Sequence, residues 1–172
     1  MANSKKKGNR GELAICKVLS EHFEQKFNRV PASGAISTIH KLSSASNRTL
    51  AGDIICPDNF SFSIENKFGY EVDLYNLFRP NHNHKSLFFE FMRQAEEDAS
   101  KIPDVIPMVI YTRTRKKPLI IMPLEGHQKE SKIKELAGIL DQHLEIRKNG
   151  KLWMISDLEE VLSKFPKSFF FD

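Results

Sequence analysis

Hydrophobic residues recur along the chain at two spacings, one typical of helices and the other typical of strands. Near the N-terminus they are three or four residues apart, which places their side chains in one stripe along a helix. We therefore predict a helix over residues 9–27 with this stripe toward the core. The stripe consists of Glu12, Cys16, Leu19, Phe23 and Phe27. Glu12 thus begins a row that is otherwise apolar.

Strict alternation marks residues 60–68, FSFSIENKF, as a strand. Its apolar face comprises Phe60, Phe62 and Ile64, and its polar face comprises Ser61, Ser63, Glu65 and Lys67. Residues 50–56 are predicted to form a second strand, and residues 57–59 the turn of an antiparallel hairpin that joins the two. A shorter strand is predicted at 29–33, ahead of a long polar loop at 34–49.

The middle of the chain predicts a second helix and a second hairpin. Ser86 is expected to be the N-cap of an amphipathic helix over 86–102, which Pro103 ends. The face expected to be buried comprises Leu87, Phe88, Phe91, Met92, Ala95, Ala99 and Ile102. Two β-rich runs at 108–112 and 119–122 flank the basic turn RTRKKP and predict a hairpin.

The last third of the chain predicts a further hairpin between two helices. The elements expected are a helix at 130–140, strands at 145–147 and 152–155, and a helix at 157–164. Asn149-Gly150 is a strong turn signal between the two strands. Ser156 is expected to cap the last helix, with Glu159 at the capping-box position. The tail at 165–172 is apolar enough to dock on the domain or on a partner subunit.

This order of elements predicts the fold class. A helix, three strands, a helix and two strands, followed by an appended region, indicate an α/β or α+β domain with a mixed central sheet flanked by helices. The chain has 172 residues, a length that suits one domain. We expect a single domain over 1–172, with its core at about 7–123 and a C-terminal α/β extension at about 124–172.

The composition is typical of a soluble globular protein. Hydrophobic residues make up 40% and charged residues 28% of the chain, and no apolar run approaches the ~18 residues of a membrane span. An amphipathic segment follows the basic N-terminus where a signal peptide would have its apolar core, so we expect no secretion. Cys16 and Cys56 lack metal-ligand spacing, which favours buried thiols in a reducing cytoplasm.

Positive charge is concentrated in three stretches without Asp or Glu, although the net charge is only +4. These stretches are 1–11, 25–52 and 105–124. Such segregation suits a polyanionic partner, and nucleic acid is the first candidate. Basic tails and hairpin tips are, however, often only solvated. The candidate DNA-binding residues are Lys5, Lys6, Lys7, Arg10, Arg29, Lys41, Arg48, Arg113, Arg115, Lys116 and Lys117.

Three residues of the predicted hairpin could carry chemistry. Glu65 and Lys67 share one face of a strand, roughly 7 Å apart at a rise of about 3.3 Å per residue. The turn brings Asp53 opposite Ile64 or within one residue of it, so that a small register adjustment sets Asp53 beside Glu65. Neighbouring carboxylates repel one another, and Mg²⁺ is commonly held by one or two carboxylates, phosphate oxygens and water. Lys67 would then hold the attacking water and offset charge on a phosphate.

Glu12 is a candidate third carboxylate. It would come near the other two if the first helix packs across this sheet. A Glu in the first turn of a helix is also favourable by itself, because of the helix dipole.

These residues resemble the signature of the PD-(D/E)xK nuclease superfamily. The matching positions are Glu12 in an N-terminal helix, Gly52-Asp53 on a strand and Glu65-Asn66-Lys67 on the next. The stretches KGNRGELAICKVLSEHF and RVPASGA also resemble Holliday-junction resolvases of archaeal type, or phage-encoded ones. Those enzymes have an Arg and a Ser-Gly before the catalytic Asp, here Arg29 and Ser33-Gly34. The resemblance covers about 7–112.

The resemblance implies a restriction-endonuclease-like core and a metal-dependent endonuclease. It implies Mg²⁺ or Mn²⁺ held by Asp53, Glu65 and Glu12, with the Asn66 carbonyl as a further candidate ligand and Lys67 orienting the water. It implies hydrolysis of four-way DNA junctions by a homodimer, leaving a 5′-phosphate, in DNA recombination and repair. It adds Ser33 to the candidate DNA-binding residues. It also implies a location in the cytoplasm, which is the cytoplasm of the host if the chain is phage-encoded.

Two positions depart from the resolvase pattern. Ala51 stands where the motif name has Pro, and Gly11 stands where the resolvases often have Arg. Two alternatives therefore remain open. One is a restriction- or repair-type DNA endonuclease of the same superfamily. The other is a non-catalytic DNA-binding protein of the same fold, against which the presence of Glu12, Asp53, Glu65 and Lys67 together argues.

Overall fold

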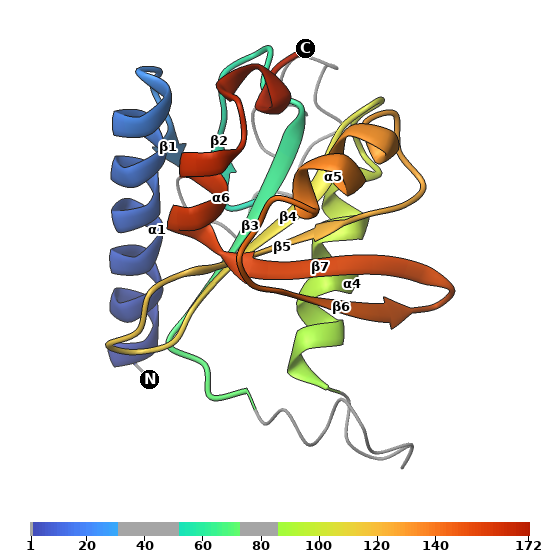
Figure 1. Ribbon diagram of the computed structural model, residues 1–172. Helices are drawn as coiled ribbons and strands as arrows, with labels where there is room; N and C mark the ends of the chain where they lie inside the picture. Colours follow the sequence, from blue (N-terminus) through green and yellow to red (C-terminus); the bar gives the residue numbers. More distant parts are fainter. Residues whose placement is uncertain (1, 31–51, 73–85) are drawn as a thin grey trace.

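The computed structural model describes residues 2–30, 52–72 and 86–172, with side chains from residue 8 onward. It confirms the predicted α+β class, because helices pack against a five-stranded mixed sheet and a two-stranded sheet lies beside it (Figure 1). None of the described helices is long and apolar enough to cross a membrane.

The central sheet has the strand order β3-β4-β5-β7-β6. Its strands are β3 (Phe62–Phe68), β4 (Ile106–Thr112), β5 (Leu119–Pro123), β6 (His143–Lys148) and β7 (Lys151–Asp157). β3 and β4 are parallel, and the other neighbours pair antiparallel. The hairpins predicted at β4–β5 and β6–β7 are confirmed, the latter around Asn149 and Gly150, which both have positive φ. Because β7 pairs with β5, the segment after residue 123 continues the same sheet.

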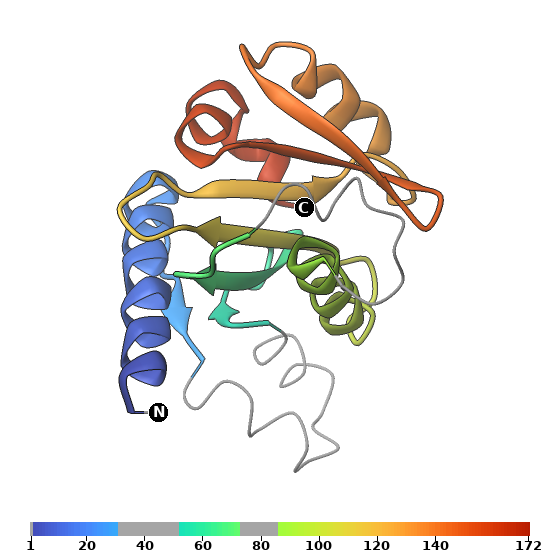
Figure 2. The ribbon, with the colours of Figure 1, turned by 90° about the horizontal axis from the view of Figure 1, so that it is seen from below.

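Side chains alternate along the strands and so enter two separate hydrophobic clusters, one on each face. The first cluster packs against α1 (Ala2–Phe23), α5 (Glu130–Ala137), α6 (Leu158–Lys164) and the 3₁₀ turn η1 (Lys167–Phe170). The second packs against α4 (Leu87–Ala99). Figure 2 shows α4 on the opposite side of the sheet from α5 and α6. In β3, Phe62 and Ile64 enter the first cluster, so Glu65 and Lys67 belong to the α4 face.

The first helix differs at both ends from the predicted range of 9–27. It begins at Ala2 and ends at Phe23. Glu24 follows with a φ of 56°, a left-handed conformation that cannot continue a right-handed helix. Phe27 is buried as predicted, but beyond the helix, where its ring lies 5.7 Å from that of Phe23. The chain reversal thus returns an aromatic residue to the same core, which the helical spacing alone cannot distinguish from another helical turn.

The predicted strands at 29–33 and 50–56 are represented by two short strands, β1 (Asn28–Arg29) and β2 (Ile54–Ile55). They pair antiparallel with each other, with Arg29 opposite Ile54. β2 therefore does not form the regular hairpin ladder with β3 that the alternation predicts, and β3 itself begins at Phe62. The rest of both predictions, at 31–33 and 50–51, and the predicted loop at 34–49 lie outside the described residues.

The second helix is confirmed, with three corrections. Ser86 occupies the N-cap position of α4, but its side chain makes no capping hydrogen bond. Leu87 is 41% exposed, and its predicted burial is wrong. The buried stripe runs through Phe88, Met92 and Ala95, and Leu87 lies about 100° around the helix from Phe88. The helix ends at Ala99 rather than at 102.

The cap of the last helix is also corrected by one residue. Asp157, and not Ser156, is the N-cap of α6, and its Oδ1 accepts a hydrogen bond from the Glu160 N–H at 3.0 Å. β7 extends through Asp157, and Ser156 is buried within it, donating its hydroxyl to the Gln142 carbonyl at 2.9 Å. Like the last helix, α5 is shorter than predicted and ends at Ala137.

The C-terminal tail docks on its own domain, one of the two partners predicted for it. Phe170 is buried in a cluster of aromatic rings. Its ring centroid lies 5.0 to 6.4 Å from those of Phe23, Phe60, Phe62, Phe165 and Phe169. The Phe170 carbonyl accepts a hydrogen bond from the Ser61 N–H at 2.9 Å, and the Ser61 hydroxyl donates to Asp172 Oδ1 at 2.7 Å. The tail thus holds the residue that leads directly into β3.

We expect the substitution Phe170→Ala to lower the free energy of unfolding by about 3–5 kcal/mol, because it removes a large buried ring and leaves a cavity. Urea unfolding monitored by the fluorescence of Trp153, the single tryptophan, which is fully buried, measures the change. The matched control is Leu144→Ala, at a side chain that is 64% exposed, which should change stability by no more than about 0.5 kcal/mol. Similar effects of the two substitutions would show that the docked tail does not contribute to the core.

Candidate active site

Asp53 lies against the edge strand β3, opposite Ile64. Its N–H donates to the Ile64 carbonyl at 2.9 Å, and its Oδ2 accepts the N–H of Asn66 at 2.9 Å. Its own carbonyl accepts the Val30 N–H at 3.0 Å. Asp53 is therefore fixed between β3 and the chain that follows β1, and the predicted register opposite Ile64 is confirmed.

The glycine before Asp53 allows this close approach. Gly52 has a φ of +78°, and a Cβ atom placed on it would lie 2.4 Å from the Ile64 carbonyl oxygen. No side chain fits that space, and a positive φ is strained for residues other than glycine. Gly52 thus lets the chain pass close enough to β3 for the Asp53 carboxylate to reach a backbone N–H of that strand.

Glu65 and Lys67 lie on the α4 face of β3, where their side chains form an ion pair. The pair is not a solvated surface contact, because the two side chains are only 8% and 15% exposed. Lys67 Nζ also lies 5.6 Å from the ring centroid of Phe91 on α4, within the range of a cation–π interaction. A carboxylate and a ring thus hold the ammonium from two sides.

Burial makes the two carboxylates of this site reluctant to ionise. It is the largest cause that raises the pKa of Asp53, although the Asn66 N–H and the charge of Lys67 act in the opposite direction. Burial, followed by the charge of Asp53, raises the pKa of Glu65 to about 7. Two carboxylates that repel one another in a buried site favour an added positive charge between them.

For Lys67, in contrast to the two carboxylates, the site favours the charged form. Burial disfavours its charged form, but the charge and hydrogen bond of Glu65 outweigh burial and raise the pKa of Lys67. The charge of Asp53 adds to this effect. Lys67 is therefore a protonated donor at neutral pH and not a base.

Glu12 is buried but forms its ion pair with Arg29 of β1. Its helix crosses β3 closely, because a Cβ on Gly11 would lie 2.5 Å from Cβ and Cγ of Phe68. A larger residue at position 11 would not fit this contact. α1 packs on the face of the sheet opposite Glu65. The charge of Glu12 is nevertheless near enough to Asp53 to raise the pKa of that carboxylate, after burial.

The remaining question is whether these residues fit a divalent cation. Within the described ranges, no three His, Cys, Asp or Glu side chains gather closely enough to hold a metal ion by themselves. Mg²⁺, however, commonly takes only one or two protein carboxylates. The Ser63 hydroxyl, on the same face of β3 as Glu65, is buried and hydrogen-bonds to no described residue, and the same holds for the Asn66 side-chain amide on the other face. Two repelling carboxylates beside unsatisfied polar atoms fit a hard cation with its water shell.

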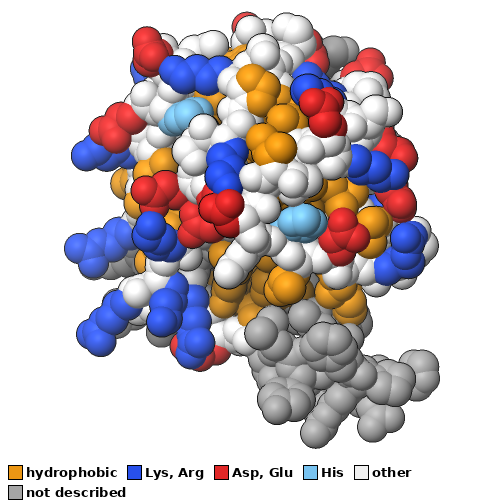
Figure 3. Space-filling view, in the orientation of Figure 1, with side chains coloured by type: hydrophobic (Ala, Val, Ile, Leu, Met, Phe, Trp, Pro, Cys, Tyr) orange, Lys and Arg blue, Asp and Glu red, His pale blue; other side chains and the backbone are white. Residues whose placement is uncertain are grey.

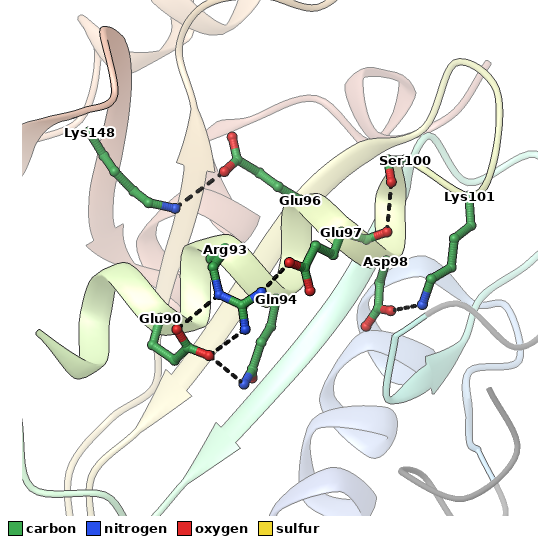
Figure 4. A network of polar contacts seen from close by, with 9 residues as sticks. All are labelled: Glu90, Arg93, Gln94, Glu96, Glu97, Asp98, Ser100, Lys101 and Lys148. Carbon is green, nitrogen blue, oxygen red and sulfur yellow. Dashed lines mark hydrogen bonds and ion pairs between the residues drawn. The ribbon is translucent and has the colours of Figure 1, made fainter. Parts of the chain in front are cut away.

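Helix α4 adds two residues that the sequence pattern did not point to. Phe91, predicted only as a core residue, contacts the Lys67 ammonium. Figure 4 shows Asp98 at the end of α4, paired with Lys101. After burial and other groups, the Asp98 charge also contributes to the raised pKa values of Asp53 and Glu65. The sequence carried no signal for Asp98, because it stands in a run of acids on the polar side of a helix.

The candidate DNA-binding residues are distributed over three places. Arg10 is exposed on α1, and the chain from Arg113 to Lys117 is exposed between β4 and β5. Figure 3 shows Lys and Arg side chains grouped where α1 and this connection lie in Figure 1. Within the group, Arg113 pairs with Glu71 and Lys117 with Glu159, whereas Arg115 and Lys116 are simply exposed.

The remaining candidates fall into three groups, which differ in what the structure describes of them. Arg29 is engaged by Glu12. Ser33, Lys41 and Arg48 lie outside the described residues. For Lys5, Lys6 and Lys7, only the helical backbone is described. The connection between β4 and β5 is therefore the best-described basic surface. Because β3 and β4 are parallel, this connection begins at the same end of the strands as Lys67.

Comparison with models of protein families gives one result. Residues 3–172 match a family described as "Phage putative PDDEXK endonuclease". No curated protein and no solved structure shows significant similarity to the chain. The matched range includes Glu12, Asp53, Glu65 and Lys67, and it also includes the C-terminal region.

We expect Asp53→Asn to raise the melting temperature of the metal-free protein at pH 8 by about 3 °C, or about 1 kcal/mol. The substitution removes a half-buried charge beside Glu65 but keeps an oxygen for the Asn66 N–H. Because the pKa of Glu65 is raised from 4.5 to about 7, the folded state binds its proton more tightly, and native stability falls as the pH rises from about 4.5 to about 7. The gain from Asp53→Asn should therefore be largest above pH 7 and shrink by pH 5.

Differential scanning calorimetry in EDTA at the two pH values tests this expectation. Asp58→Asn is the matched control, because Asp58 is exposed in the turn before β3, and it should change the melting temperature by less than about 1 °C. A lower melting temperature for Asp53→Asn at pH 8 would show that the ionised carboxylate stabilises the metal-free fold.

Proposed function

The chain belongs to the phage PDDEXK endonuclease family, and from this membership and its site we propose that it is a metal-dependent DNA endonuclease that hydrolyses phosphodiester bonds. One observation carries the proposal. Asp53, held on the Asn66 N–H, lies beside the buried pair of Glu65 and Lys67. A half-buried carboxylate that raises the pKa of a buried one, next to a protonated lysine, is expensive for the fold and is typical of active sites.

We assign the cation to Asp53 and Glu65, as Mg²⁺ or Mn²⁺. A bound divalent cation supplies Lewis-acid chemistry, lowering the pKa of a water and neutralising charge on the phosphate. Asp53 serves this role well because the Asn66 N–H fixes its carboxylate in one orientation. Glu65 would hold the cation together with Asp53, and its ion pair with the Lys67 ammonium would then be weaker.

In this proposal Lys67 orients the attacking water. Its Nζ donates a hydrogen bond to the water oxygen, which forms the new bond to phosphorus in line with the bond that breaks. The attacking water loses one proton to solvent, the 3′ oxygen of the sugar leaves and takes a proton from solvent, and the phosphate remains on the 5′ end of the other fragment. The Phe91 ring restricts the ammonium to one side of β3, which limits the positions it can occupy.

The role proposed for Glu12 depends on Arg29. Glu12 completes a three-carboxylate ligand set, together with Asp53 and Glu65, only when Arg29 releases it. A DNA phosphate is a suitable partner for the freed guanidinium, because it offers the same bidentate geometry as a carboxylate. Entry of DNA and assembly of the ligand set would then occur together.

We propose branched DNA, in particular four-way junctions, as the substrate, and a homodimer as the active form. Both rest on the resemblance of the N-terminal region and of Arg29 to Holliday-junction resolvases. The basic connection from Arg113 to Lys117 suits phosphate contacts, which position DNA without reading its sequence. Recognition by DNA shape is therefore the natural mode for this surface.

We expect the protein to cleave labelled DNA with Mg²⁺ or Mn²⁺ and not with EDTA. Asp53→Asn and Lys67→Ala should each slow cleavage by roughly a hundredfold or more while leaving DNA binding in EDTA intact. The matched controls Asp58→Asn and Lys132→Ala change exposed residues of the same types and should leave the rate unchanged. Absence of cleavage with either metal would favour a non-catalytic DNA-binding protein, and normal cutting by Asp53→Asn would refute the metal assignment.

The substrate class is tested by competition among a four-way junction, its matched duplex, a flap and a single strand. We expect the junction to be cut fastest, at two symmetric positions with 5′-phosphate products, and sedimentation to show a dimer. Cutting of the matched duplex at the same rate would instead point to a restriction- or repair-type endonuclease.

A further inference from the structure

Tyr70 presents an exposed aromatic ring next to the lysine of the site. It lies two residues beyond the end of β3, and 46% of its surface is exposed. The centroid of its ring lies 5.3 Å from that of Phe91 in an edge-on contact. Phe91 is the same residue whose ring contacts the Lys67 ammonium. One buried ring thus supports both the lysine and the exposed tyrosine.

The backbone around Tyr70 is held in place. The Tyr111 hydroxyl donates to the Tyr70 carbonyl at 2.7 Å, and the Gly69 N–H donates to the Thr112 carbonyl at 2.7 Å. Tyr111 in turn packs its ring 6.1 Å from Phe91. Because both flanking contacts are made to β4, the ring of Tyr70 is presented from the sheet and not from a free loop.

A second group at this end of the strands, Arg113, can contact a phosphate. Glu71, the residue after Tyr70, holds Arg113 through two contacts, one of them 3.1 Å long. Both Arg113 and Glu71 are exposed, so the guanidinium can exchange its carboxylate for a phosphate.

We infer that Tyr70 stacks on an unpaired nucleobase of the DNA next to the bond that is cut. The inference rests on the proposed endonuclease function and narrows its substrate class. An exposed ring has no hydrogen-bond pattern to read, but its face matches the face of any base. In a continuous duplex both faces of each base are covered by neighbours, so the ring is useful only where a base is unstacked, as at a fork, a flap or a branch point.

The test compares two DNA molecules of equal length and charge in EDTA, so that no cleavage occurs. One is a fully paired duplex, and the other is a fork with two unpaired arms. Fluorescence anisotropy gives the affinity for each at one fixed salt concentration. We expect the wild-type protein to bind the fork more tightly than the duplex. Tyr70→Ala should lower the ratio of the two affinities about tenfold, which is the effect expected from the loss of one base–aromatic stack. Tyr70→Phe and Tyr70→Trp should retain the preference for the fork, because they keep the ring.

A second readout follows the base itself. Abasic nucleotides are placed one at a time in the first unpaired positions of the fork. At one position the missing base should weaken binding of the wild type but not weaken binding of Tyr70→Ala any further, because the base and the ring are the two partners of one contact. A 2-aminopurine at that position should change its fluorescence on binding to the wild type but not to Tyr70→Ala. Leu144→Ala, an exposed apolar residue on β6, is the control and should behave as the wild type.

The outcomes separate this inference from the proposed function. If the protein cuts DNA with Mg²⁺ but Tyr70→Ala keeps the full fork preference, the stacking role is wrong and the endonuclease proposal stands. If Tyr70→Phe loses as much as Tyr70→Ala, the hydroxyl and not the ring makes the contact, and the inference is again overturned. If no DNA is cut under any condition, the proposed function fails first, whatever the binding results.

Discussion

The close approach of Gly52 and Asp53 to strand β3 is the contact on which the site depends. It brings a carboxylate within hydrogen-bond distance of the Asn66 N–H, and it is sterically open only because Gly52 has no side chain. The carboxylate then lies beside Glu65 in a buried environment that raises the pKa of both. The fold tolerates this repulsion because a backbone N–H and the Lys67 ammonium offset part of it, and a cation would offset the rest. Stability is given up at this point for a site that is ready to accept positive charge.

Strand β3 serves both the core and the site because its two faces are used differently. Phe62 and Ile64 enter the cluster beneath α1 and the C-terminal tail, and this packing fixes the position of the strand. Its start is held by the tail through Ser61, and its end is held by β4 through Gly69. Glu65 and Lys67 therefore project from a strand that is restrained along its whole length, which is the condition for a preorganised site. The C-terminal region contributes to this restraint even though it supplies none of the candidate catalytic residues.

Much of the fold could be predicted from local patterns, and the errors have a common cause. Periodicity predicted the helices, the two hairpins of the second half and the faces of β3 correctly, because side-chain direction follows from backbone geometry alone. The misplaced end of α1, the exposed Leu87 and the shifted cap of α6 arose where neighbouring elements decide the boundary. The pairing of β2 with β1, and the parallel pairing of β3 with β4, could not be predicted, because the partner of a strand is chosen by contacts distant in sequence.

The sequence by itself determined that Glu65 and Lys67 share a face of one strand, since alternation suffices for it, and it placed Asp53 within one residue of Ile64. It also determined the acid-free basic stretches and the glycine at position 52. Only the tertiary structure decided that α4 covers this face, so that Phe91 contacts Lys67 and supports Tyr70. It likewise decided that α1 packs on the other face, where Glu12 meets Arg29 instead of the other carboxylates. The physical reason is that a pattern along the chain specifies which way a side chain points, whereas its neighbours depend on which elements the core brings together.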